Sequence, residues 1–386
     1  MKKSGIIMAD LHFGASNNVD FNNELKLTLF DYISKLPKLD FCIIAGDLFD
    51  SIEYLSSDTT RSVIRFIATL LESTKKFNTE IRILEGTRTH DNKQLKTLED
   101  IFNDCLCVDR HRISFIHTVT DDILCGELKV LYLPEEYVVD DKIYYNDYFT
   151  NRYYDFIFGH GTINKVSFVK HIKSSMTAPV FNVQNLTAIC NYCYFGHIHK
   201  KSEYCDNRFK YVGPMTRWTF DQTGPCGFYY IDYDRDNNRF YEEYIENIHA
   251  PIYVTKIYDI DNTNNSDILS IWKYIYDDIY YIKSNTSVNC KIRIIVNIES
   301  SVNNISAIKD LLTLNTQNYN DIKLIINTVD SGMSDVHNEN TECRIVETYN
   351  NCPDEVKIQQ FIKNKTGRHR TIDDIRRHLC ITEEYK

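Results

Sequence analysis

Aspartate and histidine residues follow one short apolar run after another in the first half of this 386-residue chain. They stand in five blocks, which read DLH, GDLFD, GTRTHD, GHG and GHIH in chain order. Together the blocks hold four carboxylates and five imidazoles: Asp10, Asp47, Asp50, Asp91, His12, His90, His160, His197 and His199. Carboxylate oxygens mixed with imidazole nitrogens are ligands of Mn²⁺, Fe²⁺ or Zn²⁺ rather than of Ca²⁺. The residue types therefore predict a metal centre.

The number of donors predicts two ions rather than one. So many Asp and His side chains in one place would carry a large free-energy cost without cations to balance them. Two metal ions about 3.5–4 Å apart can clamp the attacking and leaving oxygens of an in-line phosphoryl displacement. The blocks therefore indicate phosphoester hydrolysis. Glycines before Asp47, His160 and His197 would let the backbone turn sharply beneath the ions.

Short buried strands must position these blocks. Apolar runs predict strands at residues 4–9, 41–45, 81–85, 156–158 and 192–195, and apolar stripes at helical spacing separate the first three. This repetition predicts a largely parallel sheet, with the polar blocks together at the carboxyl ends of its strands. Residues 113–133 and 209–246 alternate like hairpins, which predicts a second, more antiparallel sheet. The expected fold is α/β, a two-sheet sandwich flanked by helices over residues 1–250.

A domain boundary is expected near Ala250-Pro251. Beyond it, three strands alternate with helices at about 266–283 and 304–313, which predicts a compact α+β domain over residues 251–340. Residues 341–386 predict a helical tail that contains the most basic stretch of the chain. A solvated helix pair, a docking element for a partner and a DNA contact are three interpretations of this tail.

Composition and charge exclude several classes of protein. The net charge is −10, so attraction of the whole molecule to nucleic acid is not expected. No apolar run approaches the roughly 20 residues that a membrane-spanning helix needs. The first residues contain no secretory apolar segment, so we expect no signal peptide. The 12 scattered cysteines are then expected to be reduced thiols in a cytoplasmic protein.

In their order and spacing, the five blocks resemble those of the calcineurin-like metallophosphoesterases, over roughly residues 5–235. The resemblance implies two ions, with Mn²⁺ expected and Mg²⁺, Fe²⁺ or Zn²⁺ as alternatives. It assigns Asp10, His12 and His199 to one ion, His160 and His197 to the other, and Asp47 to both. It also implies that His90 is a general acid or transition-state stabiliser, and that Asp50 and Asp91 orient imidazoles.

The third block departs from the family pattern. The family usually has Gly-Asn-His-Asp or Gly-Asn-His-Glu there, and its Asn ligates the second metal. In this chain the block is longer, and Thr89 precedes His90. We take Thr89 as the candidate ligand. Since a hydroxyl is a poorer ligand than an amide oxygen, we expect weaker binding of the second ion or a water in the gap.

A second, looser resemblance narrows the subfamily. The segment YVGPMTRWTFDQTGPCGFYYIDYD is similar to one in SbcD-type DNA exonucleases and in the small subunit of phage recombination endonucleases. In these proteins a capping domain and a helical tail follow, and the tail docks on an ABC-type ATPase. The resemblance thus implies a DNA exonuclease or endonuclease of recombination and repair. It also implies DNA and an SbcC-like ATPase as partners, a homodimer within the complex, and the host cytoplasm if the chain is phage-encoded.

Two other functions remain open at this point. One is a phosphoesterase that acts on nucleotides or phosphoproteins, although such an enzyme does not need the additional domain and tail. The other is a DNA-tethering subunit whose site is impaired by the altered third block. Metal content and hydrolysis of a model diester separate the tethering subunit from the two enzymes, and hydrolysis of a nucleotide with DNA left untouched would favour the phosphoesterase.

Overall fold

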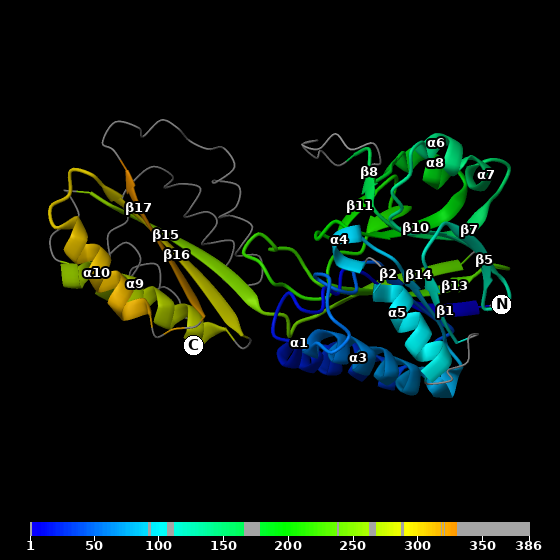
Figure 1. Cartoon of the computed structure of the whole chain (residues 1–386), viewed down its shortest axis with the longest axis horizontal. Helices are drawn as coiled ribbons and strands as arrows, with labels where there is room; N and C mark the ends of the chain where they lie inside the picture. The colour runs from blue at the N-terminus through cyan, green and yellow to red at the C-terminus, as the bar shows by residue number, and fades with distance from the viewer. Residues whose placement is uncertain are drawn as a thin grey trace. The chain divides into compact units, whose positions relative to one another are not determined.

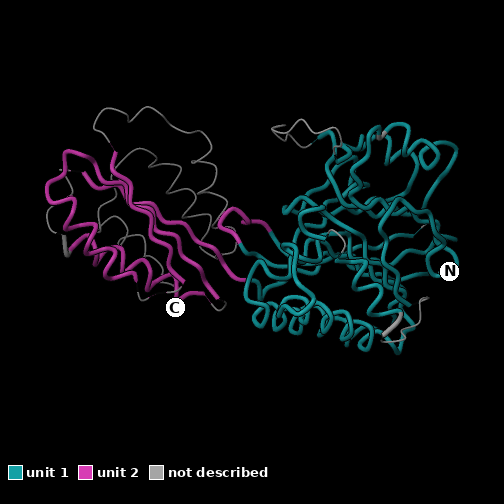
Figure 2. The backbone as a smooth tube through the Cα atoms, in the orientation of Figure 1, with its two compact units in different colours: residues 1–218, 225–250 teal, residues 219–224, 251–386 magenta. Residues whose placement is uncertain are grey.

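The computed structural model describes residues 2–91, 94–105, 112–165, 178–237, 239–261, 268–286, 289–317, 319 and 321–329. Within these ranges the chain forms two compact units, coloured separately in Figure 2. Unit 1 contains residues 2–218 and 225–250, and unit 2 contains residues 219–224 and 251–329. The chain passes between the units on either side of residues 219–224 and again between Ala250 and Pro251. The predicted helical tail, residues 341–386, lies outside the described residues.

The first sheet of unit 1 has six strands in the order β14-β13-β1-β2-β3-β4. Four of them are parallel: β1 (Lys2–Met8), β2 (Phe41–Ala45), β3 (Glu80–Leu84) and β4 (Ile113–Ile116). The hairpin of β13 (Gly227–Asp234) and β14 (Arg239–Glu246) joins this sheet antiparallel to β1. The first three parallel strands carry the DLH, GDLFD and GTRTHD blocks at their carboxyl ends.

The second sheet also has six strands, in the order β11-β12-β10-β7-β6-β5. Its central strands are parallel: β6 (Leu128–Leu133), β7 (Tyr154–His160), β10 (Cys190–Gly196) and β12 (Phe209–Tyr211). The edge strands β5 (Thr120–Leu124) and β11 (Ser202–Tyr204) are antiparallel. The prediction of two sheets is confirmed. The prediction that residues 113–133 and 209–246 together form an antiparallel second sheet is wrong, because β4, β13 and β14 belong to the first sheet.

Helices cover the outer faces of both sheets (Figure 1). The first sheet is covered by α1 (Asn18–Leu25), the π-helical turn η1 (Lys26–Phe30), α2 (Asp31–Lys35), α3 (Asp58–Thr74) and α5 (Gln94–Asp100). The 3₁₀ turn η2 (Lys75–Phe77) and the π-helical turn η3 (Ile101–Cys105) follow α3 and α5. Beside the second sheet lie α6 (Asp141–Tyr144), α7 (Asn146–Phe149), α8 (Val183–Ala188) and the short pair β8 (Thr162–Ile163) and β9 (Val180–Phe181). The remaining short helix, α4 (Arg88–Asp91), carries the third block.

Alternating side chains of β1 show how the layers are held together. Ile6 and Met8 pack with the helices on the outer face, whereas Ile7 and Ala9 pack in the core between the two sheets. Successive residues of a strand point to opposite faces, so a continuous apolar run fits a strand that is buried on both sides. The core between the sheets includes aromatic rings of the second sheet, among them Phe156 and Phe158. Unit 1 is therefore a sandwich of two sheets between helical layers.

Unit 2 is built from three parallel strands and two helices. Its sheet has the order β15-β16-β17, with β15 (Ile252–Ile260), β16 (Cys290–Glu299) and β17 (Ile322–Val329). The helices α9 (Ile268–Asn285) and α10 (Ile305–Thr316) connect them and pack on one face, as Figure 1 shows. Since every second residue of β16 is buried, this sheet has one core face. Within the described residues, the molecule has no helix that is both long and apolar enough to cross a membrane.

Candidate metal centre

The predicted ligands come together where strands of both sheets end. Asp10 and His12 follow β1, and Asp47 follows β2 in the first sheet. His160 is the last residue of β7, and His197 and His199 follow β10 in the second sheet. Their donor atoms form two groups. Within each group, the ligand atoms lie within 4.8 Å of one another. The carboxyl edges of the two sheets thus share one polar site, as the strand-end pattern predicts.

Four of these residues have backbone angles that only glycine adopts readily. The φ angles are 50° at Asp10, 44° at His12, 51° at Asp47 and 89° at His197. A left-handed conformation costs a non-glycine residue about 1–2 kcal/mol. Such strain persists where the surrounding structure over-determines it, and it is concentrated at functional sites. The backbone is therefore bent to bring these side chains to one point at the expense of folding stability.

The first group consists of Asp10, His12, Asp47 and His199. The Nε2 atoms of His12 and His199 are 3.0 Å apart, and His12 Nε2 is 3.6 Å from Asp47 Oδ2. Asp10 is completely buried, and its Oδ2 has no hydrogen-bond partner among the described residues. A buried carboxylate oxygen without a partner is costly, and a cation beside it removes that cost. These residues fit a divalent cation.

The second group consists of Asp47, His160 and His197. His160 Nε2 lies 3.2 Å from Asp47 Oδ2, and the ring is completely buried. On its other side, His160 Nδ1 donates a hydrogen bond to the carbonyl oxygen of Ala45 at 2.8 Å. This bond fixes the ring orientation and turns Nε2 toward the site, as metal-binding imidazoles commonly require. The second group therefore also fits a metal ion.

Asp47 belongs to both groups, and its electrostatics reflect that position. Burial acts to raise the pKa of Asp47, but the facing imidazoles of His160 and His12 outweigh it and hold the pKa well below its ordinary value. For His160, burial acts to lower the pKa, but Asp47, Asp10 and Glu135 raise it to about 10. The carboxylates thus favour positive charge in the site. In the absence of metal ions, protons bound to the imidazoles supply this charge.

Thr89 does not lie at the second group, contrary to the prediction from the third block. Thr89 is exposed on α4. Thr87 takes the place next to the ligands: its hydroxyl is 3.3 Å from His160 Nε2 and 3.4 Å from His197 Nδ1. Thr87 directly follows Gly86 at the end of the strand, whereas the two extra residues of the block carry Thr89 onto the helix. Counting from the strand end would have identified Thr87.

Glu135 is a site residue that the block pattern does not predict. It follows β6 through Pro134, and its Oε2 lies 3.1 Å from His197 Nδ1. Burial acts to raise the pKa of Glu135, but His197 and His160 outweigh it and lower the pKa. A signal is present in the sequence, because the apolar run of β6 ends in polar residues like those of the other strands. Those residues include neither Asp nor His, so the five blocks do not extend to this strand.

The other acidic predictions have separate outcomes. Asp50 Oδ1 lies 3.3 Å from His12 Nδ1, on the far side of the ring from the first group, so its carboxylate faces the imidazole that it is predicted to orient. Asp91 does not orient an imidazole in this way. Its carboxylate accepts hydrogen bonds from the backbone N–H groups of Leu48, Phe49 and Gly86. Asp91 thus joins the loops that follow β2 and β3, which present Asp47 and Thr87.

His90 lies beside the first group. Its ring centroid is 4.8 Å from that of His12, in an edge-to-face arrangement. Its Nδ1 donates a hydrogen bond to the backbone carbonyl of Asp50. Because Nδ1 is committed to the backbone, Nε2 is the ring nitrogen left for chemistry.

Trp218 borders the same group from the segment after β12. The centroid of its indole ring lies 4.6 Å from that of His12 and 5.1 Å from that of His199. Trp218 is partly exposed, so an aromatic surface adjoins the first group. A buried network just before Trp218 holds this segment: Asn247 donates to the carbonyl oxygen of Met215, and Thr216 and Asn247 both donate to the carboxylate of Glu24.

Glu24 makes the stability of this network dependent on pH. Burial raises the pKa of Glu24 to about 7, against the lowering effect of its bonds to Thr216 and Asn247. Between its ordinary pKa and pH 7, the folded state holds a proton that the unfolded state has lost, so the Glu24 contribution to stability falls by about 3 kcal/mol as pH rises. We expect Glu24→Gln to flatten this decline in urea unfolding measured from pH 4.5 to 8. An unchanged slope would contradict this prediction.

No family model matches this chain, and no curated protein matches it either.

Proposed function

We propose that this chain is a dinuclear metal-dependent DNA nuclease of the calcineurin-like metallophosphoesterase type. The observation that carries the proposal is the shared carboxylate: the buried Asp47 belongs to both groups of ligand atoms. Asp10, His12 and His199 would complete the site of one divalent ion, and His160 and His197 would help to hold the other. The two ions, with Mn²⁺ as our choice, would supply Lewis-acid stabilisation of the charge that develops on the phosphate.

The protein side chains contribute orientation and a proton. Asp50 holds the His12 ring, and the backbone carbonyl of Ala45 holds the His160 ring, so that their donor atoms stay fixed during the reaction. His90, oriented by the carbonyl of Asp50, is the residue to which we assign stabilisation of the pentavalent transition state or protonation of the leaving oxygen. A group that is already oriented needs no reorganisation when the reaction occurs.

The choice of DNA as substrate rests on two features. The first is the similarity of residues 211–234 to SbcD-type nucleases. The second is Trp218, since a partly exposed aromatic ring next to a phosphate site can stack a nucleobase, which is worth about 1–3 kcal/mol per base. Docking on an ABC-type ATPase, homodimerisation and a capping role for unit 2 are proposed from the resemblance alone.

The direct test is digestion of end-labelled single- and double-stranded DNA with Mn²⁺, with Mg²⁺ and with a chelator. We expect Mn²⁺-dependent cleavage that the chelator abolishes. If DNA is untouched while nucleotides or phosphopeptides are hydrolysed rapidly, the alternative phosphoesterase is correct. If the folded chain binds fewer than two ions and leaves bis(4-nitrophenyl) phosphate intact, it is a tethering subunit.

His90→Ala should separate catalysis from metal binding. We expect kcat on DNA to fall about 10²-fold, because general acid–base catalysis by one positioned group contributes at least that factor. The variant should still bind as many Mn²⁺ ions as the wild type, as counted by isothermal titration calorimetry. A leaving group that needs no proton, as in bis(4-nitrophenyl) phosphate, should show a much smaller loss. Loss of an ion in this variant would instead make His90 a ligand.

A further inference from the structure

We propose that Glu135 is the oxygen ligand of the second cation, in the role that the family gives to an amide. The inference rests on the proposed dinuclear centre and specifies how this chain completes it. Neither the strand-end blocks nor the family pattern includes a glutamate here. The proposal concerns a divalent cation that accepts both imidazole and carboxylate donors.

The position of the Glu135 carboxylate carries the proposal. Oε2 lies 3.1 Å from His197 Nδ1 and 3.9 Å from His160 Nε2, and both histidines belong to the second group. The Thr87 hydroxyl is 3.3 Å from the same oxygen. The carboxylate therefore faces the atoms that would surround the ion. Its distances to the two nitrogens are those of atoms that can share one cation after small side-chain rotations.

The surroundings of Glu135 orient this oxygen. The Tyr137 hydroxyl donates a hydrogen bond to Oε1 at 2.9 Å, which leaves Oε2 toward the histidines. The backbone N–H of Glu135 donates to the carbonyl oxygen of Glu85 at 3.2 Å, which ties the loop after β6 to the end of β3. A hydrogen bond to the second oxygen of a carboxylate is a common way to position a metal ligand.

Burial separates Glu135 from an ordinary surface carboxylate. Only 2% of its side chain is exposed, and Asp47, exposed by 3%, shares His160 with it. Two carboxylates with so little access to water need a strong source of positive charge. A hydroxyl such as that of Thr87 is a poorer oxygen ligand than an amide, whereas a carboxylate is a strong oxygen donor and also adds negative charge beside the cation. The carboxylate therefore compensates for the missing amide and argues against an impaired second site.

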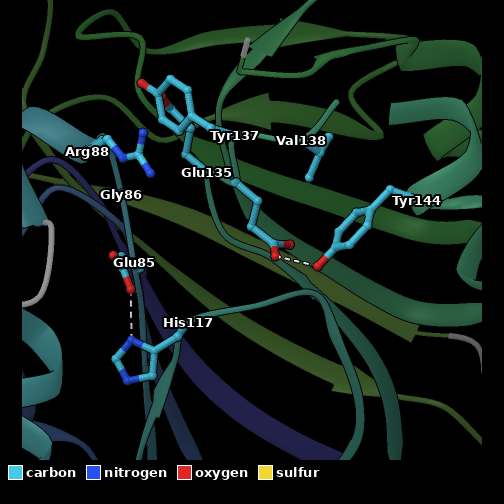
Figure 3. A pocket seen from close by; sticks show the side chains of 9 residues that line it. Glu85, Gly86, Arg88, His117, Glu135, Tyr137, Val138 and Tyr144 are labelled. Carbon is cyan, nitrogen blue, oxygen red and sulfur yellow. Dashed lines mark hydrogen bonds and ion pairs between the residues drawn. The ribbon is translucent and has the colours of Figure 1, made fainter. Parts of the chain in front are cut away.

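A cavity also borders Glu135. The cavity has a volume of about 290 Å³ and is lined by Glu135, Gly86, Arg88, Tyr137 and Tyr144, among others. Figure 3 shows Arg88 beside Tyr137 on one side of the cavity and Tyr144 on another. The Arg88 guanidinium lies 5.1 Å from the centre of the Tyr137 ring. Glu135 therefore borders both the cavity and the second group.

The test is Mn²⁺ titration of the chelator-stripped full-length chain by isothermal titration calorimetry, with electron paramagnetic resonance of the bound ions. We expect two ions on the wild type. In Glu135→Leu, which keeps a similar size but removes both side-chain oxygens, the weaker ion should lose affinity at least 10-fold while the tighter ion is unaffected. Glu136→Leu is the matched control. Glu136 lines the same cavity, but its carboxylate binds the Tyr144 hydroxyl and the Val119 backbone.

A second variant distinguishes a ligand from a structural partner of His197. Glu135→Cys places a thiolate at this position, and thiolates prefer soft cations. We expect this variant to gain affinity for Cd²⁺ relative to Mn²⁺ by at least 10-fold, which loss of an ion pair would not produce. Two ions of unchanged affinity in Glu135→Leu, or an unchanged Cd²⁺ preference in Glu135→Cys, would overturn the assignment of Glu135 but not the dinuclear centre. Fewer than two ions on the wild type would overturn the dinuclear centre as well.

Discussion

Replacement of Asp47 by Asn is expected to remove both metal ions and to lower hydrolysis of DNA by at least about 10³-fold. Asp47 Oδ2 lies 3.2 Å from His160 Nε2 and 3.6 Å from His12 Nε2, so one oxygen faces both groups. An amide has the same shape but no charge. The variant therefore leaves the imidazoles in place and removes the negative charge that both ions share.

The measurement is metal content after dialysis together with the rate of DNA cleavage in Mn²⁺. Asp155→Asn is the matched control, because Asp155 is also a buried carboxylate of unit 1. It lies in β7 near the start of the strand and accepts hydrogen bonds from the Lys129 backbone and the Tyr233 hydroxyl. The control should keep both ions and full activity. Cleavage by Asp47→Asn at the wild-type rate would show that the metal assignment is wrong.

Replacement of Gly46 by Ala is expected to disrupt the second group through a steric clash. The φ angle of Gly46 is +83°, and an added Cβ would lie 2.2 Å from Nδ1 of His160. That nitrogen donates to Ala45, so the ring cannot move away without losing its hydrogen bond. Overpacking and the left-handed backbone together should cost at least about 3 kcal/mol of folding stability. Displacement of His160 should also remove the second ion and nearly all activity.

Gly126→Ala separates the backbone effect from the clash. Gly126 lies in the turn between β5 and β6 with a φ of +73°, and no atom lies within 4 Å of an added Cβ. This variant should lose only about 1–2 kcal/mol and retain both ions. Thermal unfolding with and without Mn²⁺, and metal counting, compare the two variants. Equal losses of stability and of metal in both variants would contradict the proposed role of Gly46.

The positions of the strands and of most candidate ligands follow from local sequence. Apolar runs such as FCIIA form strands because both faces are buried, and the residues after them reach the edge of a sheet. Residue type and position after a strand are therefore enough to identify Asp10, His12, Asp47, His160, His197 and His199. The alternation of strands and helices likewise predicts parallel pairing, which holds for four strands in each sheet of unit 1.

Other features depend on the tertiary structure, because they arise from contacts between segments that lie far apart in the sequence. A hairpin has the same alternation of polar and apolar residues whichever sheet it joins. The pairing of β13 with β1 is therefore known only from the folded structure. Because the third block contains inserted residues, its sequence does not show which threonine lies next to the second group. The folded loop places Thr87, rather than Thr89, beside His160. Glu135 becomes a site residue through contacts with His160 and His197, which lie 25 and 62 residues further along the chain. Residue type and spacing thus determined the chemistry available to this protein, whereas the packing of the two sheets decided which oxygens complete the site.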